Sequence, residues 1–272
     1  MRFLGIMVFT VMTLTARGAF AETYSFGVIP QFEPRKLAAI WLPVLKELSR
    51  RTGYTFVMTG SSNIPVFEAS INLGKFDFAY MNPYQVLQAT KNQKYIPLVR
   101  DGSRRLQGII VVRKDSPLTR PQLLDGKKVA FPSPNAFGAS ILVQAELQEK
   151  FKIKIRSVYV QTHSSVYLNV ILGETDAGGG VVSTLDKQTP AIRSALKIIY
   201  KTRSAPPHAV MANSRVPPKR RDRVRRAFLE MSKTAEGRHL LERIPMSKVV
   251  AASAGDYRPM ASWGLKKIYY GH

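Results

Sequence analysis

The order of strand-like and helix-like segments is the feature that most constrains the fold of this chain. Short runs rich in aromatic and β-branched residues, typical of strands, occupy 24–29, 54–60 and 76–81. Between them, 35–53 and 64–75 have apolar residues at helical spacing, and each of these segments ends near a glycine. This β-α-β-α-β order predicts an α/β fold with mixed, mostly parallel sheets and flanking helices.

A second unit of the same kind follows. It occupies 109–205, and a strand-like run then leads the chain back toward the first unit. We therefore predict two lobes, with 22–108 and 206–272 in lobe 1 and 109–205 inserted as lobe 2. Two similar α/β lobes joined by two crossing segments are typical of a clamshell. Its ligand lies in the cleft, at the carboxyl ends of the strands, and hinge motion is expected near 107–112 and 205–211.

The first 21 residues have the pattern of a secretory signal peptide. Arg2 supplies a positive start, residues 3–16 are apolar, and Ala19-Phe20-Ala21 fits an A-x-A cleavage site. The alternative is a membrane anchor, but the apolar run is shorter than the ~20 residues that a spanning helix needs. We predict cleavage near Ala21/Glu22 and export to the periplasm.

The residue types that catalysis usually requires are scarce. The chain has no cysteine and four histidines, and it contains no H-E-x-x-H, G-x-S-x-G or P-loop motif. No paired carboxylates stand out. We therefore predict a protein that is not an enzyme, with no catalytic residue, metal or cofactor. The run Gly178-Gly179-Gly180 lacks the spacing of a phosphate loop, and we interpret it as a tight bend at the cleft.

The charge is strongly positive, at +23 for the full chain, and much of it lies in the stretch 214–228. Such a field attracts anions, nucleic acid and anionic membranes. No aromatic residues interleave with these charges, as a strand-binding groove would require. We interpret the stretch as a solvated helix face. A lipid-binding patch is the alternative, and no nucleic-acid partner is predicted.

One loop has the features of an anion site. The stretch 130–138, AFPSPNAFG, lies between a strand-like and a helix-like run. The start of a helix presents free backbone N–H groups, and its dipole favours negative charge. We therefore expect a small anion to bind at this loop.

Several phrases, in this order, resemble a known family. They are FGVIPQFEPRKLAAIWLPVLKELSRRTGY, NLGKFDFAYMNPYQVL, VVRKDSPLTRPQLLDGKKVAF, THSSVYLNVILGETDAGGG and TAEGRHLLERI. The chain resembles the periplasmic solute-binding proteins for phosphonate, phosphite and phosphate over nearly all of residues 24–263. The resemblance implies the type II binding-protein clamshell, capture of a small oxyanion, and delivery to an ABC permease. The alternative is a sensory protein that presents a non-phosphonate ligand to a histidine kinase ectodomain.

The pocket departs from the family pattern in its polar residues. Relatives carry a Ser-Thr-Ser-Gly loop where this chain has Asn135-Ala136-Phe137-Gly138. The family's histidine matches His163. Acidic residues of the aminophosphonate binders are replaced by Ser164 and, near the second crossing, by His208. Their absence argues against an aminophosphonate ligand.

The expected ligand contacts come from five turns of the two lobes. They are Gln31, Phe32, Tyr80, Asn82, Ser133, Asn135, Ala136, Phe137, Gly138, His163, Ser164 and His208. The protein is expected to be a monomer that meets the membrane only through its permease or kinase partner.

Overall fold

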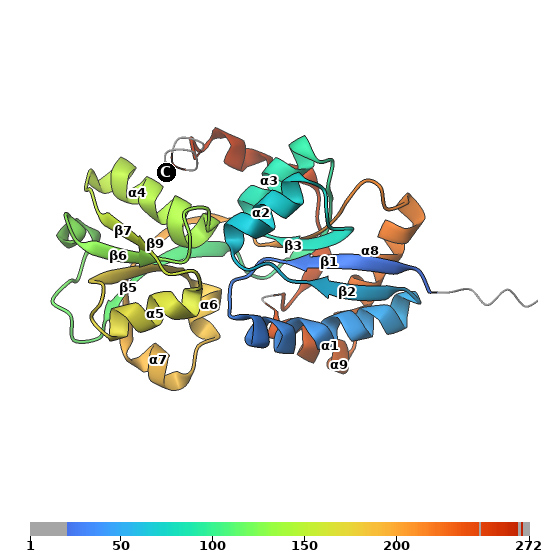
Figure 1. The fold of residues 1–272 in the computed structure, drawn as a ribbon, viewed down its shortest axis with the longest axis horizontal. Coiled ribbons are helices and arrows are strands. Elements are labelled where there is room, and N and C mark those ends of the chain that lie inside the picture. The colour runs from blue at the N-terminus through green and yellow to red at the C-terminus, as the bar shows by residue number, and fades with distance from the viewer. Residues whose placement is uncertain (1–20, 245, 266–267, 269–272) are drawn as a thin grey trace, which may run out of the picture.

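The computed structural model describes residues 21–244, 246–265 and 268, which form two sheets side by side (Figure 1). The first sheet has the strand order β11-β4-β10-β3-β1-β2, and the second has the order β7-β6-β8-β5-β9. We call each sheet, with the helices packed on it, the first lobe and the second lobe. The predicted signal peptide, apart from Ala21, lies outside the described residues.

The first lobe contains β1 (Thr23–Val28), α1 (Pro34–Thr52), β2 (Thr55–Thr59), α2 (Ile64–Asn72), β3 (Phe78–Met81), α3 (Pro83–Asn92), β4 (Ile96–Asp101), β10 (Ala209–Ala212), α8 (Pro218–Met231), α9 (Ala235–Arg243), β11 (Val249–Ala251) and the 3₁₀ turns η3 (Ala254–Asp256) and η4 (Arg258–Ser262).

The second lobe contains β5 (Leu106–Arg113), the 3₁₀ turn η1 (Pro121–Leu124), β6 (Lys128–Phe131), the π-helical turn η2 (Phe137–Ile141), α4 (Leu142–Phe151), β7 (Arg156–Tyr159), α5 (His163–Ile171), β8 (Ala177–Val181), α6 (Val182–Asp186), α7 (Pro190–Ser194) and β9 (Leu196–Ala205).

Both sheets are mixed, which confirms the predicted fold class. Parallel pairs join β1 to β2 and β3 in the first sheet, and β6 to β7 and β8 in the second. The strands on either side of the two crossings, β4, β5, β9 and β10, pair antiparallel with their neighbours. The sheets are thus more evenly mixed than the mostly parallel pairing expected from the strand–helix order.

The chain crosses between the lobes twice, at 102–105 between β4 and β5 and at 206–208 between β9 and β10. The second crossing agrees with the hinge expected near 205–211. The first hinge, expected near 107–112, was placed wrongly, because those residues lie within β5 and pair with β8 and β9. Lobe boundaries at residues 108/109 and 205/206 stay a prediction.

Local sequence explains how the main helices begin and end. α1 starts with Pro34, whose missing N–H costs nothing in the first turn. It ends at Gly53, where a φ of 72° lets the backbone N–H cap the carbonyl of Ser49. Asn82 and Gln85 form a capping box that starts α3 directly after β3. These signals place the start of α3 at the carboxyl end of a central strand.

The three glycines 178–180 form a strand, so the predicted tight bend is wrong. They lie in β8, the central strand of the second sheet, and are fully buried. A Cβ at Gly179 would lie 2.3 Å from the Ala139 carbonyl oxygen, and one at Gly180 would lie 2.5 Å from the Tyr167 hydroxyl. The glycines therefore allow η2 and α5 to pack closely on the sheet.

The two lobes are packed against each other. The largest apolar cluster includes Phe26 and Trp41 of the first lobe and continues into Leu106, Phe137 and Val181 of the second. Two smaller clusters lie within the second lobe. Because one apolar core runs across both lobes, we interpret this arrangement as a closed clamshell. Among the described residues, the structure contains no helix with the length and apolar character needed to span a bilayer.

Candidate functional site

Turns from both lobes meet in a cleft between the sheets, and we call one small cavity in this cleft the inner chamber. Its volume is about 10 Å³, room for about one water molecule. The residues that line it are Ile29, Gln31, Ile64, Asn82, Leu106, Ala136, Phe137, Gly138, Ala139, His163, Val181 and His208. Seven of the twelve predicted contacts are thus brought together. The other five lining residues, which are all apolar, were not foreseen: Ile29, Ile64, Leu106, Ala139 and Val181.

Asn82 brings a free amide group to the inner chamber. Its Oδ1 accepts the backbone N–H of Gln85 at 2.9 Å, and the Gln85 Oε1 accepts the backbone N–H of Asn82 at 3.2 Å. Both side chains are buried, and both amide nitrogens lack an acceptor within the described chain. A buried amide nitrogen without a partner is costly. The Asn82 amide is therefore a donor that a bound acceptor would satisfy.

The first turn of η2, together with the loop before it, presents three backbone donors. Its own hydrogen bonds use the N–H groups of Ala136, Ser140 and Ile141. The backbone N–H groups of Phe137, Gly138 and Ala139 then have no acceptor among the described residues, as expected in the first turn of a helix. All three residues line the inner chamber. Their position fits the anion-binding role expected for this loop.

Two buried imidazoles complete the polar lining. His163 begins α5, its backbone N–H donates to the Gln31 carbonyl across the cleft, and its Nδ1 lies 3.2 Å from the Thr184 hydroxyl. The His208 ring stacks on Tyr80 with centroids 5.2 Å apart. Burial lowers the pKa of each histidine to about 3, and His163 contributes to the lowered pKa of His208. Both rings are therefore neutral at neutral pH and can donate one hydrogen bond each.

Phe137 forms an aromatic wall with a residue of the first lobe. Its ring stacks on Tyr84 of α3, with centroids 6.2 Å apart and planes 9° apart. Both side chains are buried. This contact fills the space between η2 and α3, which is one reason why the closed inner chamber is small.

Asn135 connects the lobes at the rim of the inner chamber. Its Oδ1 accepts the Ser133 hydroxyl, and its amide donates to Glu68 of α2. Burial raises the pKa of Glu68 to about 7, although the hydrogen bond from Asn135 lowers it. Neither Asn135 nor Ser133 lines the inner chamber. We call the Asn135–Glu68 contact the interlobe latch.

The other three predicted contacts lie nearby. Phe32 lines a separate small cavity beside α1 and α6. Ser164, in the first turn of α5, lines none of the cavities in the cleft. Tyr80 lies under the His208 ring, on the side of the cleft where the chain crosses between lobes.

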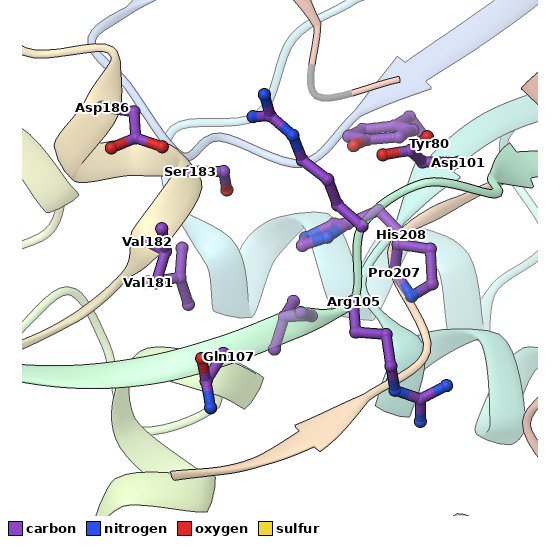
Figure 2. Close-up of a pocket in the computed structure, with 12 residues that line it drawn as sticks. Tyr80, Asp101, Arg105, Gln107, Val181, Val182, Ser183, Asp186, Pro207 and His208 are labelled. Carbon is purple, nitrogen blue, oxygen red and sulfur yellow. The ribbon is translucent and has the colours of Figure 1, made fainter. Parts of the chain in front are cut away.

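A second space, the outer chamber, lies on that side (Figure 2). Its volume is about 60 Å³, and it shares Leu106, Val181 and His208 with the inner chamber. Its other lining residues are Tyr80, Asp101, Arg104, Arg105, Gln107, Val182, Ser183, Asp186 and Pro207. Of these nine residues, the sequence interpretation named only Tyr80 as a ligand contact and missed the other eight. The described part of the chain contains no cluster of three metal-ligating side chains in either chamber or elsewhere.

Comparison with curated proteins finds relatives of two kinds. The chain is 24% identical over 237 residues to the phosphate-import protein PhnD of Mycolicibacterium smegmatis, covering 79% of this chain and 74% of that protein. It is 27% identical over 146 residues to the tetrathionate sensor histidine kinase TtrS of Salmonella typhimurium. That alignment covers 50% of this chain and spans only 24% of the kinase.

Solved structures show the same fold. PhnD1 from Prochlorococcus marinus, in complex with methylphosphonate, matches with a TM-score of 0.79 and 16% identity, covering 90% of this chain and 98% of that one. The family model for the periplasmic substrate-binding protein of phosphonate ABC transporters matches residues 26–257. Its members bind substrates and are not enzymes, in agreement with the sequence prediction. The chain therefore belongs to the phosphonate family of periplasmic substrate-binding proteins of ABC transporters.

Proposed function

We propose that the inner chamber binds the oxyanion group of a phosphonate, phosphite or phosphate. The observation that carries this proposal is the set of unsatisfied donors: three backbone N–H groups of η2 and the amide nitrogen of Asn82. The neutral imidazole of His208 adds one more donor, and that of His163 adds another in the tautomer that carries its proton on Nε2. No carboxylate is among the described residues that line this chamber. Donors that converge with no carboxylate among them are suited to an oxyanion.

The binding event is a closure of the two lobes. The closed inner chamber has room for about one water molecule, so a larger anion requires the lobes to open and close again. The crossings at 102–105 and 206–208 are the natural hinges, because they alone connect the described sheets. We propose the predicted division, 22–108 with 206–272 and 109–205, as the two moving bodies, except that residues 106–108 lie in β5 and move with the second body.

A thermal-shift screen followed by calorimetry tests the ligand class. Phosphate, phosphite, methylphosphonate and sulfate are compared with an uncharged solute of similar size. A ligand that binds the native protein raises the melting temperature by mass action. We expect at least one phosphorus oxyanion to do so. The proposal is wrong if none of them shifts the melting temperature while an uncharged solute does.

The proposed partner is an ABC permease, to which the closed, liganded form delivers its anion. The similarity to a phosphate-import protein supports transport. The partial similarity to a sensor kinase supports the alternative, in which the protein presents its ligand to a kinase ectodomain. The two are distinguished by purified partners: a transporter shows ligand-dependent stimulation of ATP hydrolysis, and a kinase shows ligand-dependent autophosphorylation. Light scattering tests the expected monomer.

Residues 1–21 are proposed to direct export and to be removed. The support is the A-x-A pattern at 19–21 together with membership in a periplasmic family. Mass spectrometry of the protein recovered from the periplasm should give a chain that starts at Glu22. An intact N-terminus on the recovered protein would refute the signal peptide and favour an anchor.

A further inference from the structure

Asp101 lines the outer chamber, and one oxygen of its buried carboxylate has no hydrogen-bond partner among the described residues. Asp101 ends β4 and is only 1% exposed. Its Oδ1 accepts three hydrogen bonds, from the backbone N–H and hydroxyl of Ser103 and from the backbone N–H of Lys248, at 2.8–3.1 Å. Its Oδ2 accepts none in the described chain. A buried acceptor of this kind is costly unless a donor reaches it.

The groups around Asp101 come from both lobes. Figure 2 shows Tyr80, Asp101 and His208 together on one side of the chamber, with Ser183 and Asp186 of α6 facing them. Tyr80 is buried. These polar groups surround about 60 Å³, enough for about four waters. The chamber is therefore suited to a small polar group.

The two chambers are neighbours within one cleft. Leu106, Val181 and His208 line both, so their side chains form the boundary between them. An oxyanion held by η2 and Asn82 in the inner chamber can extend a short substituent past His208. That substituent would enter the outer chamber, where the buried Asp101 oxygen is available.

We propose that the outer chamber is a subsite for a hydrogen-bond donor, a hydroxyl or an ammonium, on a short substituent of the bound oxyanion, with the Oδ2 of Asp101 as its acceptor. This inference rests on the proposed function. Acidic residues are missing at Ser164 and His208, which argued from sequence against an amino group. Asp101, the last residue of β4 before the crossing to β5, provides a different carboxylate at the cleft. Arg104 and Arg105, both exposed, line the same chamber, as does the exposed Asp186. The two positive charges of the arginines are thus balanced by the negative charges of Asp101 and Asp186.

Calorimetry with four phosphonates tests the subsite. Methylphosphonate and ethylphosphonate carry no donor, hydroxymethylphosphonate carries a hydroxyl, and aminomethylphosphonate carries an ammonium. We expect the wild-type protein to bind at least one donor-bearing ligand at least ~10-fold more tightly than both alkyl ligands, as for a hydrogen bond to a charged group. The ligand that gains identifies the donor as hydroxyl, ammonium or both.

The informative variant is Asp101→Asn. Its Oδ1 can keep the three structural hydrogen bonds while a donating amide nitrogen replaces the free oxygen. We expect the preference for the donor-bearing ligand over methylphosphonate to fall at least ~10-fold. The matched control, Asp222→Asn, removes the same charge from the exposed surface of α8 and should keep the wild-type preference. Melting curves establish that both variants fold. Tyr80→Phe removes only a hydroxyl and provides a second test of the preference for the donor-bearing ligand over methylphosphonate.

The outcomes separate this inference from the proposed function. If methylphosphonate binds but the donor-bearing ligands have no advantage, the subsite is refuted and the proposed function stands. If Asp101→Asn weakens all four ligands equally, Asp101 has only a structural role and the subsite is refuted. If no phosphonate and no inorganic oxyanion binds the folded wild-type protein, the proposed function fails, and the subsite fails with it.

Discussion

The inner and outer chambers share a boundary but are built differently. The inner chamber uses helix starts: the first turn of η2, the capping asparagine of α3 and the first residue of α5. The outer chamber is lined by residues at the two crossings: Asp101 lies directly before the first crossing, and Pro207 lies within the second. Helix starts provide donors, whereas the free group at Asp101 is an acceptor. One cleft can therefore hold an anionic group beside a donor group.

The largest effect should come from separating η2 from the sheet. In Gly179→Ala the new Cβ would lie 2.3 Å from the Ala139 carbonyl oxygen, a backbone atom that cannot move alone. We expect the free energy of unfolding in urea to fall by about 3 kcal/mol. The control is Gly60→Ala, because a Cβ at Gly60 meets nothing within 4 Å. Equal stability of the two variants would show that β8 does not fix η2.

The next largest effect tests the charge preference of the inner chamber. Asn82→Asp keeps the oxygen that caps α3 and replaces the free amide with a negative charge. We expect the affinity for phosphite or methylphosphonate, measured by calorimetry, to fall about 100-fold. Asn63→Asp is the matched control, since Asn63 caps α2 in the same way but does not line the cleft. An unchanged affinity in Asn82→Asp would place the anion elsewhere.

A smaller effect is expected at the interlobe latch. Asn135→Ala removes a hydrogen bond that joins the two lobes. We expect ligand dissociation, followed by stopped-flow fluorescence, to accelerate about 5-fold, as for the loss of about 1 kcal/mol. Asn169→Ala removes a hydrogen bond within α5 instead and should leave the dissociation rate unchanged. Equal rates in all three proteins would exclude the latch.

The smallest effect is a pH dependence at the same contact. Burial raises the pKa of Glu68 from 4.5 to about 7. The folded protein therefore favours the protonated acid, and this contribution to stability is lost as the pH rises from about 4.5 through about 7. Glu68→Gln lacks the titration. We expect the melting temperature of the variant at pH 8 to be about 2–4 °C higher than that of the wild type. The shift is modest because Glu68 is partly exposed and solvent screens its charge.

At pH 4.5 the melting temperatures of Glu68→Gln and the wild type should be alike. The buried histidines, with pKa values near 3 against 6.5, reduce stability as the pH falls below 6.5. They do so in both proteins, so the difference between the two melting curves isolates Glu68. A difference that does not change with pH would show that Glu68 does not titrate in this range.

Local patterns predicted the inner chamber far better than the outer one. Asn82 was found because it lies in one of the turns expected to line the cleft, and 135–138 because they lie between a strand-like and a helix-like run. His163 came from the family resemblance. The side-chain direction of Asn135 could not be predicted, because its partner Glu68 lies 67 residues away. Asp101 and Arg104 were missed because nothing in their local sequence marks a crossing segment as part of a cleft.

The sequence by itself determined the two α/β lobes, the helix starts that surround the cleft and the family of the protein. These features depend on residues close in the chain: apolar periodicity, capping residues and glycines at helix ends. Only the tertiary structure decided that the glycines 178–180 form a packed strand, that Asn135 binds the opposite lobe and that a carboxylate oxygen lies free beside His208. Each of these depends on atoms brought together by the packing of two sheets, and such contacts leave no local pattern in the sequence.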